Sequence, residues 1–167
     1  MKKLAEAVLL TIMTAALVCA GAVSVSADMP IYKILDSGPC GDGLTWEYYG
    51  YKGLYGELRI TGEGDMTLYP EGDYPWSRYR TDLERLIIYP GVTSIPDCAF
   101  RDGFFEGDLI VPEGVVSVGD NAFRACQRFD GVLSLPGSLV TIGDYAFAWC
   151  NHLSGGLTIP EIISLSE

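Results

Sequence analysis

Histidine is almost absent from this sequence, which has one, His152, among its 167 residues. Catalytic triads and most zinc sites draw on histidine as a base or as a ligand, so this scarcity leaves them little to use. We expect His152 to lie in a polar turn, Asn151-His152-Leu153, rather than to act in catalysis. The sequence therefore predicts a protein that is not an enzyme.

Basic residues are also scarce, with 11 lysines and arginines against 22 acidic residues and a formal net charge of −11. Binding to nucleic acid or to anionic lipid depends on clustered basic side chains, so the composition argues against both partners. The acidic residues show no context that favours a glycosidase pair, and solvation at turns explains them. Their acidic, glycine-containing segments lack the spacing of calcium-binding loops. We therefore expect no metal and no cofactor.

The N-terminus has the three-part pattern of a secretory signal peptide. Two lysines precede an apolar stretch at residues 7–23, and Val25 and Ala27 occupy the small-residue positions that signal peptidase recognises. The apolar stretch is long enough to span a bilayer, so an uncleaved anchor is the alternative, but the Val-Ser-Ala ending favours cleavage. We predict that residues 1–27 are a signal peptide, that the chain meets a membrane only during export, and that it is secreted or associated with the cell surface.

Internal repeats dominate the second half of the chain. Ala-Phe pairs recur 23 and then 24 residues apart, at residues 99–100, 122–123 and 146–147. Each pair ends the same pattern: Leu-x-apolar, an apolar residue four positions on and another three positions after that. A last apolar residue follows the pair. All seven positions are apolar in residues 86–105, 109–129 and 133–153, and a fourth unit begins at Leu157.

This period predicts a repeat solenoid that is mainly β, built from short coils of 23–24 residues. Leu-x-apolar forms a strand, and a proline that cannot donate to a sheet ends it, at positions 112, 136 and 160. Gly119-Asp120 and Gly143-Asp144 predict a turn before the Ala-Phe pair. Because no coil buries its apolar face alone, the coils must stack, with the phenylalanines in an internal ladder. We assign residues 85–160 to about three coils plus the start of a fourth.

The residues on either side of the repeats have other roles. Residues 28–84 are rich in glycine, tyrosine and aspartate, and we predict strands at residues 44–46 and 58–61 followed by a loop at residues 62–65. A solenoid needs its first coil covered, so residues 28–84 are predicted to be an N-terminal β-rich cap. Residues 161–167 are predicted to be a truncated or frayed tail, and an open fourth coil would favour self-association.

The repeats resemble the BspA-type leucine-rich repeats of bacterial surface proteins. The resemblance rests on Val92-Thr93-Ser94-Ile95, on residues 118–126 and 142–150 (Val/Ile-Gly-Asp-x-Ala-Phe), and on Leu157-Thr158-Ile159-Pro160. Residues 37–41, 44–46, 58–62 and 75–76 also look like the segment that often precedes such repeats. The resemblance covers roughly residues 37–160, and it implies an extracellular protein, in some members an adhesin, without catalytic residues. Gly103 departs from the pattern, because the later units have a cysteine near this position.

Four cysteines follow the predicted signal peptide, and none is part of a Cys-x-x-Cys pair. Cys126 and Cys150 occupy the same place in successive coils, so their Cα atoms would lie about 5 Å apart, within the range of a disulfide. We expect buried free thiols, because cysteine packs as a small apolar residue, and a disulfide is the alternative. We expect Cys98 to lie near the surface.

Two surfaces are predicted to bind a ligand. The outward residues of the first strand ladder include Ile87 and Ile110, a small apolar patch that packing under the cap or in a dimer would also explain. The turn after each Ala-Phe pair gathers an aromatic residue and arginines, which are enriched in binding hot spots. Its residues are Arg124, Gln127, Arg128, Trp149 and His152. The alternative is that Trp149 only covers its own coil.

Together these features predict a secreted or cell-surface protein that recognises an extracellular protein or glycan through its solenoid. The alternative function is a fragment of a longer repeat protein with a structural role and no independent activity.

Overall fold

The computed structural model describes residues 33–51, 54–154 and 164–165. The predicted signal peptide and residues 155–163, with most of the predicted fourth coil, lie outside the described residues. Within the described ranges, no helix is long and apolar enough to cross a membrane. The described part is a mainly β solenoid of about three turns that follows an N-terminal antiparallel sheet, as the repeat pattern predicts.

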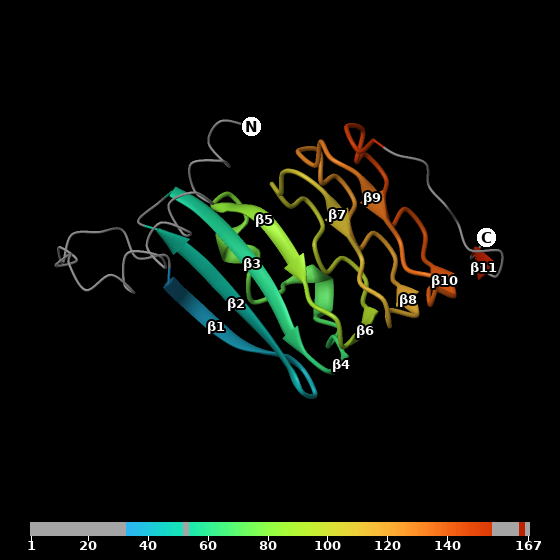
Figure 1. Ribbon diagram of the computed structural model, residues 1–167, viewed down its shortest axis with the longest axis horizontal. Helices are drawn as coiled ribbons and strands as arrows, with labels where there is room; N and C mark the ends of the chain where they lie inside the picture. The colour runs from blue at the N-terminus through green and yellow to red at the C-terminus, as the bar shows by residue number, and fades with distance from the viewer. Residues whose placement is uncertain (1–32, 52–53, 155–163, 166–167) are drawn as a thin grey trace, which may run out of the picture. The chain divides into compact units, whose positions relative to one another are not determined.

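The cap is an antiparallel sheet to which the first strand of the solenoid is added (Figure 1). Its strands, in spatial order, are β1 (Lys33–Gly41), β2 (Leu44–Tyr51), β3 (Leu54–Gly62) and β5 (Leu83–Ile88). The two predicted cap strands are confirmed in β2 and β3. No sequence pattern predicted β1, whose Pro39 is tolerated because β1 lies at the edge of the sheet.

The cap already contains the strand of an earlier coil. β5 pairs in parallel with β3, with Leu58 opposite Leu86 and Ile60 opposite Ile88. The predicted loop at residues 62–65 is wrong in part, because Gly64–Asp65 forms β4, which pairs in parallel with the strand of the next coil. The short 3-10 helices η1 (Pro70–Gly72) and η2 (Ser77–Tyr79) follow β4. The coil geometry therefore begins before residue 85, inside the region that we predicted to be cap alone.

The coils stack through two sets of short parallel strands (Figure 1). One set contains β4, β6 (Val92–Ile95), β8 (Ser117–Val118), β10 (Thr141–Ile142) and β11 (Ser164–Leu165). The other contains β7 (Leu109–Ile110) and β9 (Leu133–Ser134), and both end before the prolines at positions 112 and 136. Ser164 and Leu165, which we predicted to belong to the tail, pair with Thr141 and Ile142 of β10.

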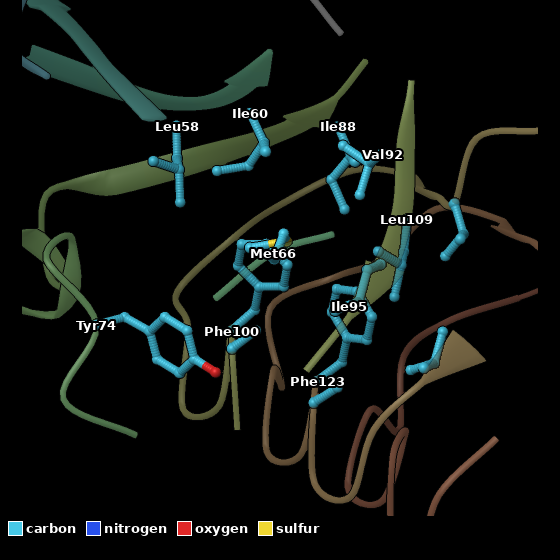
Figure 2. Close-up of a cluster of buried hydrophobic side chains, with 14 of the residues drawn as sticks. Leu58, Ile60, Met66, Tyr74, Ile88, Val92, Ile95, Phe100, Leu109 and Phe123 are labelled. Atoms are coloured by element: carbon cyan, nitrogen blue, oxygen red, sulfur yellow. The ribbon is translucent and has the colours of Figure 1, made fainter. Parts of the chain in front are cut away.

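The predicted phenylalanine ladder is confirmed, and it starts one layer earlier than predicted. The ring centroids of Phe100 and Phe123 are 5.2 Å apart, and those of Phe123 and Phe147 are 5.4 Å apart. Trp76 continues the stack below Phe100, at 5.7 Å. Figure 2 shows Leu58 and Ile60 pointing from the cap sheet into the same core that holds Phe100 and Phe123. One continuous apolar core therefore joins the cap to the coils.

Two aromatic side chains end the hydrogen-bond ladder between coils. Within the solenoid, backbone amides of one coil donate to carbonyls of the next, as from Phe100 to Ala122 at 2.8 Å. The equivalent carbonyls of the first coil accept from side chains instead. The Tyr74 hydroxyl donates to the Asp97 carbonyl at 2.7 Å, and the Trp76 indole N–H donates to the Ala99 carbonyl at 2.9 Å. The cap thus satisfies carbonyls that a preceding coil would otherwise serve.

Replacing Trp76 with phenylalanine tests this role, because the ring stays in the stack while the donor is lost. We expect Trp76→Phe to lower the free energy of unfolding by about 1–3 kcal/mol, the usual result of leaving a buried acceptor unsatisfied. Urea unfolding followed by circular dichroism measures the change. Trp149→Phe is the matched control, since Trp149 is exposed, and should shift stability by no more than about 0.5 kcal/mol. Equal stability of the Trp76→Phe variant and the original chain would contradict the capping role.

Aspartate side chains fix the turn before each Ala-Phe pair. Oδ1 of Asp97 accepts a hydrogen bond from the backbone N–H of Asp120 at 2.7 Å, and Oδ1 of Asp120 accepts one from Asp144 at 2.7 Å. Each bond passes beside a glycine of the next coil. A Cβ added to Gly119 would lie 2.3 Å from Asp97 Oδ1. The Gly-Asp pair of the repeat is therefore required for close stacking of the turns, as well as for the turn itself.

Candidate binding surface

The turns around each Ala-Phe pair place two residues per coil in the left-handed backbone region. The first position has φ values of 56–57° in the three coils, and the second has φ values of 57–64°. The residues at the first position are Cys98, Asn121 and Tyr145, and those at the second are Asp102, Ala125 and Trp149. Since this region favours glycine and asparagine, tyrosine and tryptophan are unusual occupants.

Tyr145 and Trp149 gain little packing in return for this backbone strain. The left-handed conformation costs roughly 1–2 kcal/mol for a residue with a Cβ. Yet Tyr145 is 70% exposed and Trp149 is 56% exposed. Backbone strain that the core does not require is typical of functional sites. The two aromatic side chains are therefore the leading feature of a candidate binding surface on this edge of the solenoid.

The strain at Tyr145 predicts a gain in stability when it is removed. We expect Tyr145→Asn to raise the free energy of unfolding by about 0.5–1 kcal/mol, because asparagine tolerates the left-handed region and already occupies the equivalent Asn121. Thermal unfolding of the two proteins measures the difference. Tyr89→Asn, another exposed tyrosine that lies outside the left-handed positions, is the control and should bring no gain. A loss of stability in Tyr145→Asn would show that the side chain packs more than its exposure indicates.

We define the turn surface as residues 101–104, 124–128 and 148–152, together with Asn121 and Tyr145. The structure brings Arg124 and Trp149 into contact, as the sequence predicted for neighbouring turns. The Arg124 guanidinium lies 4.5 Å from the centroid of the Trp149 ring, and its Nη1 donates to Asn121 Oδ1 at 3.2 Å. These contacts hold the guanidinium in a defined position on the ring, which favours recognition over a freely moving side chain.

The other predicted residues of the turn surface are exposed but less fixed. Arg128 lies 5.5 Å from the ring centroid of Phe104 and 3.5 Å from Glu106 Oε1. Gln127 and His152 are also exposed. Sequence reasoning missed Tyr145, Phe104 and Arg101 on this surface. Tyr145 could have been found by its alignment with Asn121, a residue type that marks the left-handed position.

The predicted isoleucine patch is less even than its sequence pattern suggested. Ile110 on β7 is 57% exposed, but Ile87 on β5 is half-buried. Ile87 pairs with Arg59 of the cap sheet, and β5 is hydrogen-bonded to β3 rather than to β7. The two isoleucines therefore belong to different sheets, and Ile110 alone presents a large apolar side chain.

An open groove of about 360 Å³ runs across the other set of parallel strands. Hydroxyl side chains from successive coils line it, at Ser94, Ser117 and Thr141. It contains no aromatic residue and no cation among its lining residues. Across the described ranges, no cluster of histidine, cysteine and acidic residues could hold a metal ion. The groove thus lacks the anchoring side chains that the turn surface carries.

The cysteines beneath the turn surface are free thiols, as expected. The Cys126 thiol donates to the Phe100 carbonyl at 3.0 Å, and the Cys150 thiol donates to the Phe123 carbonyl at 3.1 Å. A hydrogen bond with Cys150 and burial both raise the pKa of Cys126 above its usual range. In the first coil the Phe105 ring fills the equivalent space, since a Cβ on Gly103 would lie 2.2 Å from it. These thiols support the turns by packing and by hydrogen bonds to the coil below.

Comparisons with known proteins agree with this architecture. A family model described as "BspA type Leucine rich repeat region" matches residues 77–165 in 6 copies. The structure is similar to the crystal structure of a leucine-rich repeat protein from Eubacterium ventriosum, with a TM-score of 0.51 and 22% sequence identity. That similarity covers 68% of this chain but only 35% of the other, so this chain spans about a third of that protein's length. No curated protein sequence matches the chain.

Proposed function

Since the chain belongs to the BspA-type leucine-rich repeat family, whose repeats are typically binding surfaces and generally not catalytic, we propose that it recognises an extracellular macromolecule through the turn surface. One observation carries this proposal. Tyr145 and Trp149 are bulky, exposed aromatic side chains held at strained backbone positions that the fold does not need them to fill. Selection for binding explains why these positions are not asparagine or glycine.

The proposed setting is the exterior of a bacterial cell, where the protein is secreted or surface-associated and acts in adhesion. The signal-peptide pattern of residues 1–27 and the family's usual location support this setting. The partner is an extracellular protein or a glycan.

Binding to an array of extracellular matrix proteins and glycans tests the proposal. We expect saturable binding that Trp149→Ala weakens at least about tenfold, since truncation of a central aromatic anchor commonly costs about 2 kcal/mol or more. Val140→Thr is the control, because Val140 is exposed on the strand that also contributes to the groove rather than on the turn surface. Ile110→Ser in the same assay tests the isoleucine position.

Three outcomes would overturn the proposal. One is binding that Trp149→Ala leaves unchanged. Another is binding that only Ile110→Ser removes, which would move the site to the strand ladder. The third is no binding to any arrayed ligand by protein that circular dichroism shows to be folded.

A further inference from the structure

Arginine is concentrated beside the turn surface although the chain as a whole is acidic. The chain has 22 acidic residues and 11 basic ones. Four of these 11 lie along one edge of the coils, at positions 80, 101, 124 and 128. Arg80 follows η2 and lines the same small surface hollow as Arg101 of the next coil. The arginines therefore form a row that continues from the cap into the coils.

Two of these arginines have no acidic partner. Arg101 pairs with Asp102 at 3.4 Å and Arg128 pairs with Glu106 at 3.5 Å, both as exposed ion pairs that contribute little to stability. In the described part of the chain, no carboxylate forms an ion pair with Arg80 or Arg124. Uncompensated guanidinium groups on so acidic a chain leave a local positive potential at this edge.

The arginines are also spaced by the stacking of the coils. Arg101 and Arg124 directly follow Phe100 and Phe123, whose ring centroids are 5.2 Å apart. Their side chains therefore leave neighbouring coils about one strand spacing apart. Guanidinium groups bind carboxylate and sulfate oxygens in pairs, through two parallel N–H donors each. A row of such forks fits a ligand whose negative groups recur along a chain.

The aromatic part of the turn surface restricts the ligand further. Arg124 rests on the Trp149 ring at 4.5 Å, so a cation and an exposed ring are presented together, with Tyr145 in the same coil as Trp149. Sugar rings combine an apolar C–H face, which packs on an aromatic ring, with polar and charged groups at the edge. The exposed side chains of Gln127 and Asn151 add amide donors and acceptors beside them.

We propose that the turn surface, with Arg80, binds an anionic polysaccharide whose carboxylate or sulfate groups contact the arginine row while a sugar ring packs on Trp149. This inference rests on the proposed function and names the class of its ligand. Duplex nucleic acid fits less well, because its binding commonly takes about six to ten phosphate contacts, and a net charge of −11 opposes them. An acidic protein would use the arginines but would leave the exposed rings without a sugar face.

The test is a titration of the full chain with four probes: a sulfated polysaccharide, a carboxylated one, neutral dextran and duplex DNA. We expect binding to one or both anionic polysaccharides and none to dextran. Replacing both Arg101 and Arg124 with glutamine should weaken binding at least about tenfold, since one charge-assisted hydrogen bond is commonly equivalent to that factor. The control, Lys33→Gln, removes a charge from the exposed edge of the cap sheet and should bind as the original chain does. Raising sodium chloride from about 50 to about 300 mM should also weaken binding, by screening.

The sulfated and carboxylated probes separate the two sources of negative charge. Equal binding to dextran, tight binding to DNA, or full binding by the Arg101→Gln/Arg124→Gln variant would overturn the inference. Trp149→Ala separates this failure from failure of the proposed function. If an arrayed protein or neutral glycan binds and Trp149→Ala abolishes that binding, the turn surface is the site but its ligand is not an anionic polysaccharide. If Trp149→Ala leaves every interaction unchanged, both proposals fail.

Discussion

Truncating Phe123 to alanine is expected to lower the free energy of unfolding by about 3–5 kcal/mol. The Phe123 side chain is fully buried, at 0% exposure, and its ring is stacked between Phe100 and Phe147. The variant loses the transfer free energy of the ring and opens a cavity in the middle of the ladder, where both neighbours are held by their own coils. Domains of this size are stable by about 5–15 kcal/mol, so the change removes a large share of the total.

Urea unfolding monitored by far-ultraviolet circular dichroism measures this loss. Phe104→Ala provides the matched control, because it makes the same chemical change at a side chain that is 41% exposed, and should change stability by less than about 1 kcal/mol. Similar values for the two variants would show that the ladder does not hold the coils together. If the Phe123→Ala protein does not fold, Phe123→Leu provides a milder step that should still be less stable than Phe104→Ala.

Adding one methyl group at Gly119 is expected to destabilise the solenoid by about 3 kcal/mol, near the upper end for overpacking. The new Cβ would lie 2.3 Å from Asp97 Oδ1 and 2.6 Å from the Asp97 backbone nitrogen. The backbone atom cannot rotate away as a flexible side chain could, so the coils must separate locally. That separation would also break the 2.7 Å hydrogen bond from Asp120 to Asp97.

Gly137 supplies an internal control for the same substitution. A Cβ there meets nothing within 4 Å, and its φ is outside the left-handed region, so Gly137→Ala should change stability by no more than about 0.5 kcal/mol. Gly143→Ala should behave as Gly119→Ala does, since its Cβ would lie 2.3 Å from Asp120 Oδ1. Thermal melts of the three variants compare them directly. Equal melting temperatures for Gly119→Ala and Gly137→Ala would mean that the turns accommodate the added methyl without strain.

The stacking of the coils could be predicted because its signals recur. Ala-Phe pairs 23 and 24 residues apart are enough to align Phe100, Phe123 and Phe147 in one ladder. The earlier layer escaped prediction for two physical reasons. Tryptophan replaces phenylalanine at Trp76, without an alanine before it. The strand spacing from Ile60 to Ile88 is also 28 residues, so the repeat period is lost there.

The candidate site was predictable in composition but not in geometry. The contact between Arg124 and Trp149 follows from their places in neighbouring turns, which the repeat pattern defines. The importance of Tyr145 depends on its φ of 56°, and a backbone angle cannot be deduced from one tyrosine in a sequence. Ile87 shows the opposite limit, because its burial depends on pairing with the cap sheet, and the repeat carries no signal for that pairing.

The recurring left-handed positions have a consequence for how such proteins diversify. Residues as different as cysteine, asparagine and tyrosine occupy one position with nearly the same φ, and aspartate, alanine and tryptophan occupy the other. The coil therefore keeps its path while the side chain changes, so mutation can explore new chemistry on this edge without remodelling the scaffold. Duplication of a coil would add two such variable positions at once. Evolvability of this kind makes the edge a natural library, and an engineer could vary the same positions to obtain new binders.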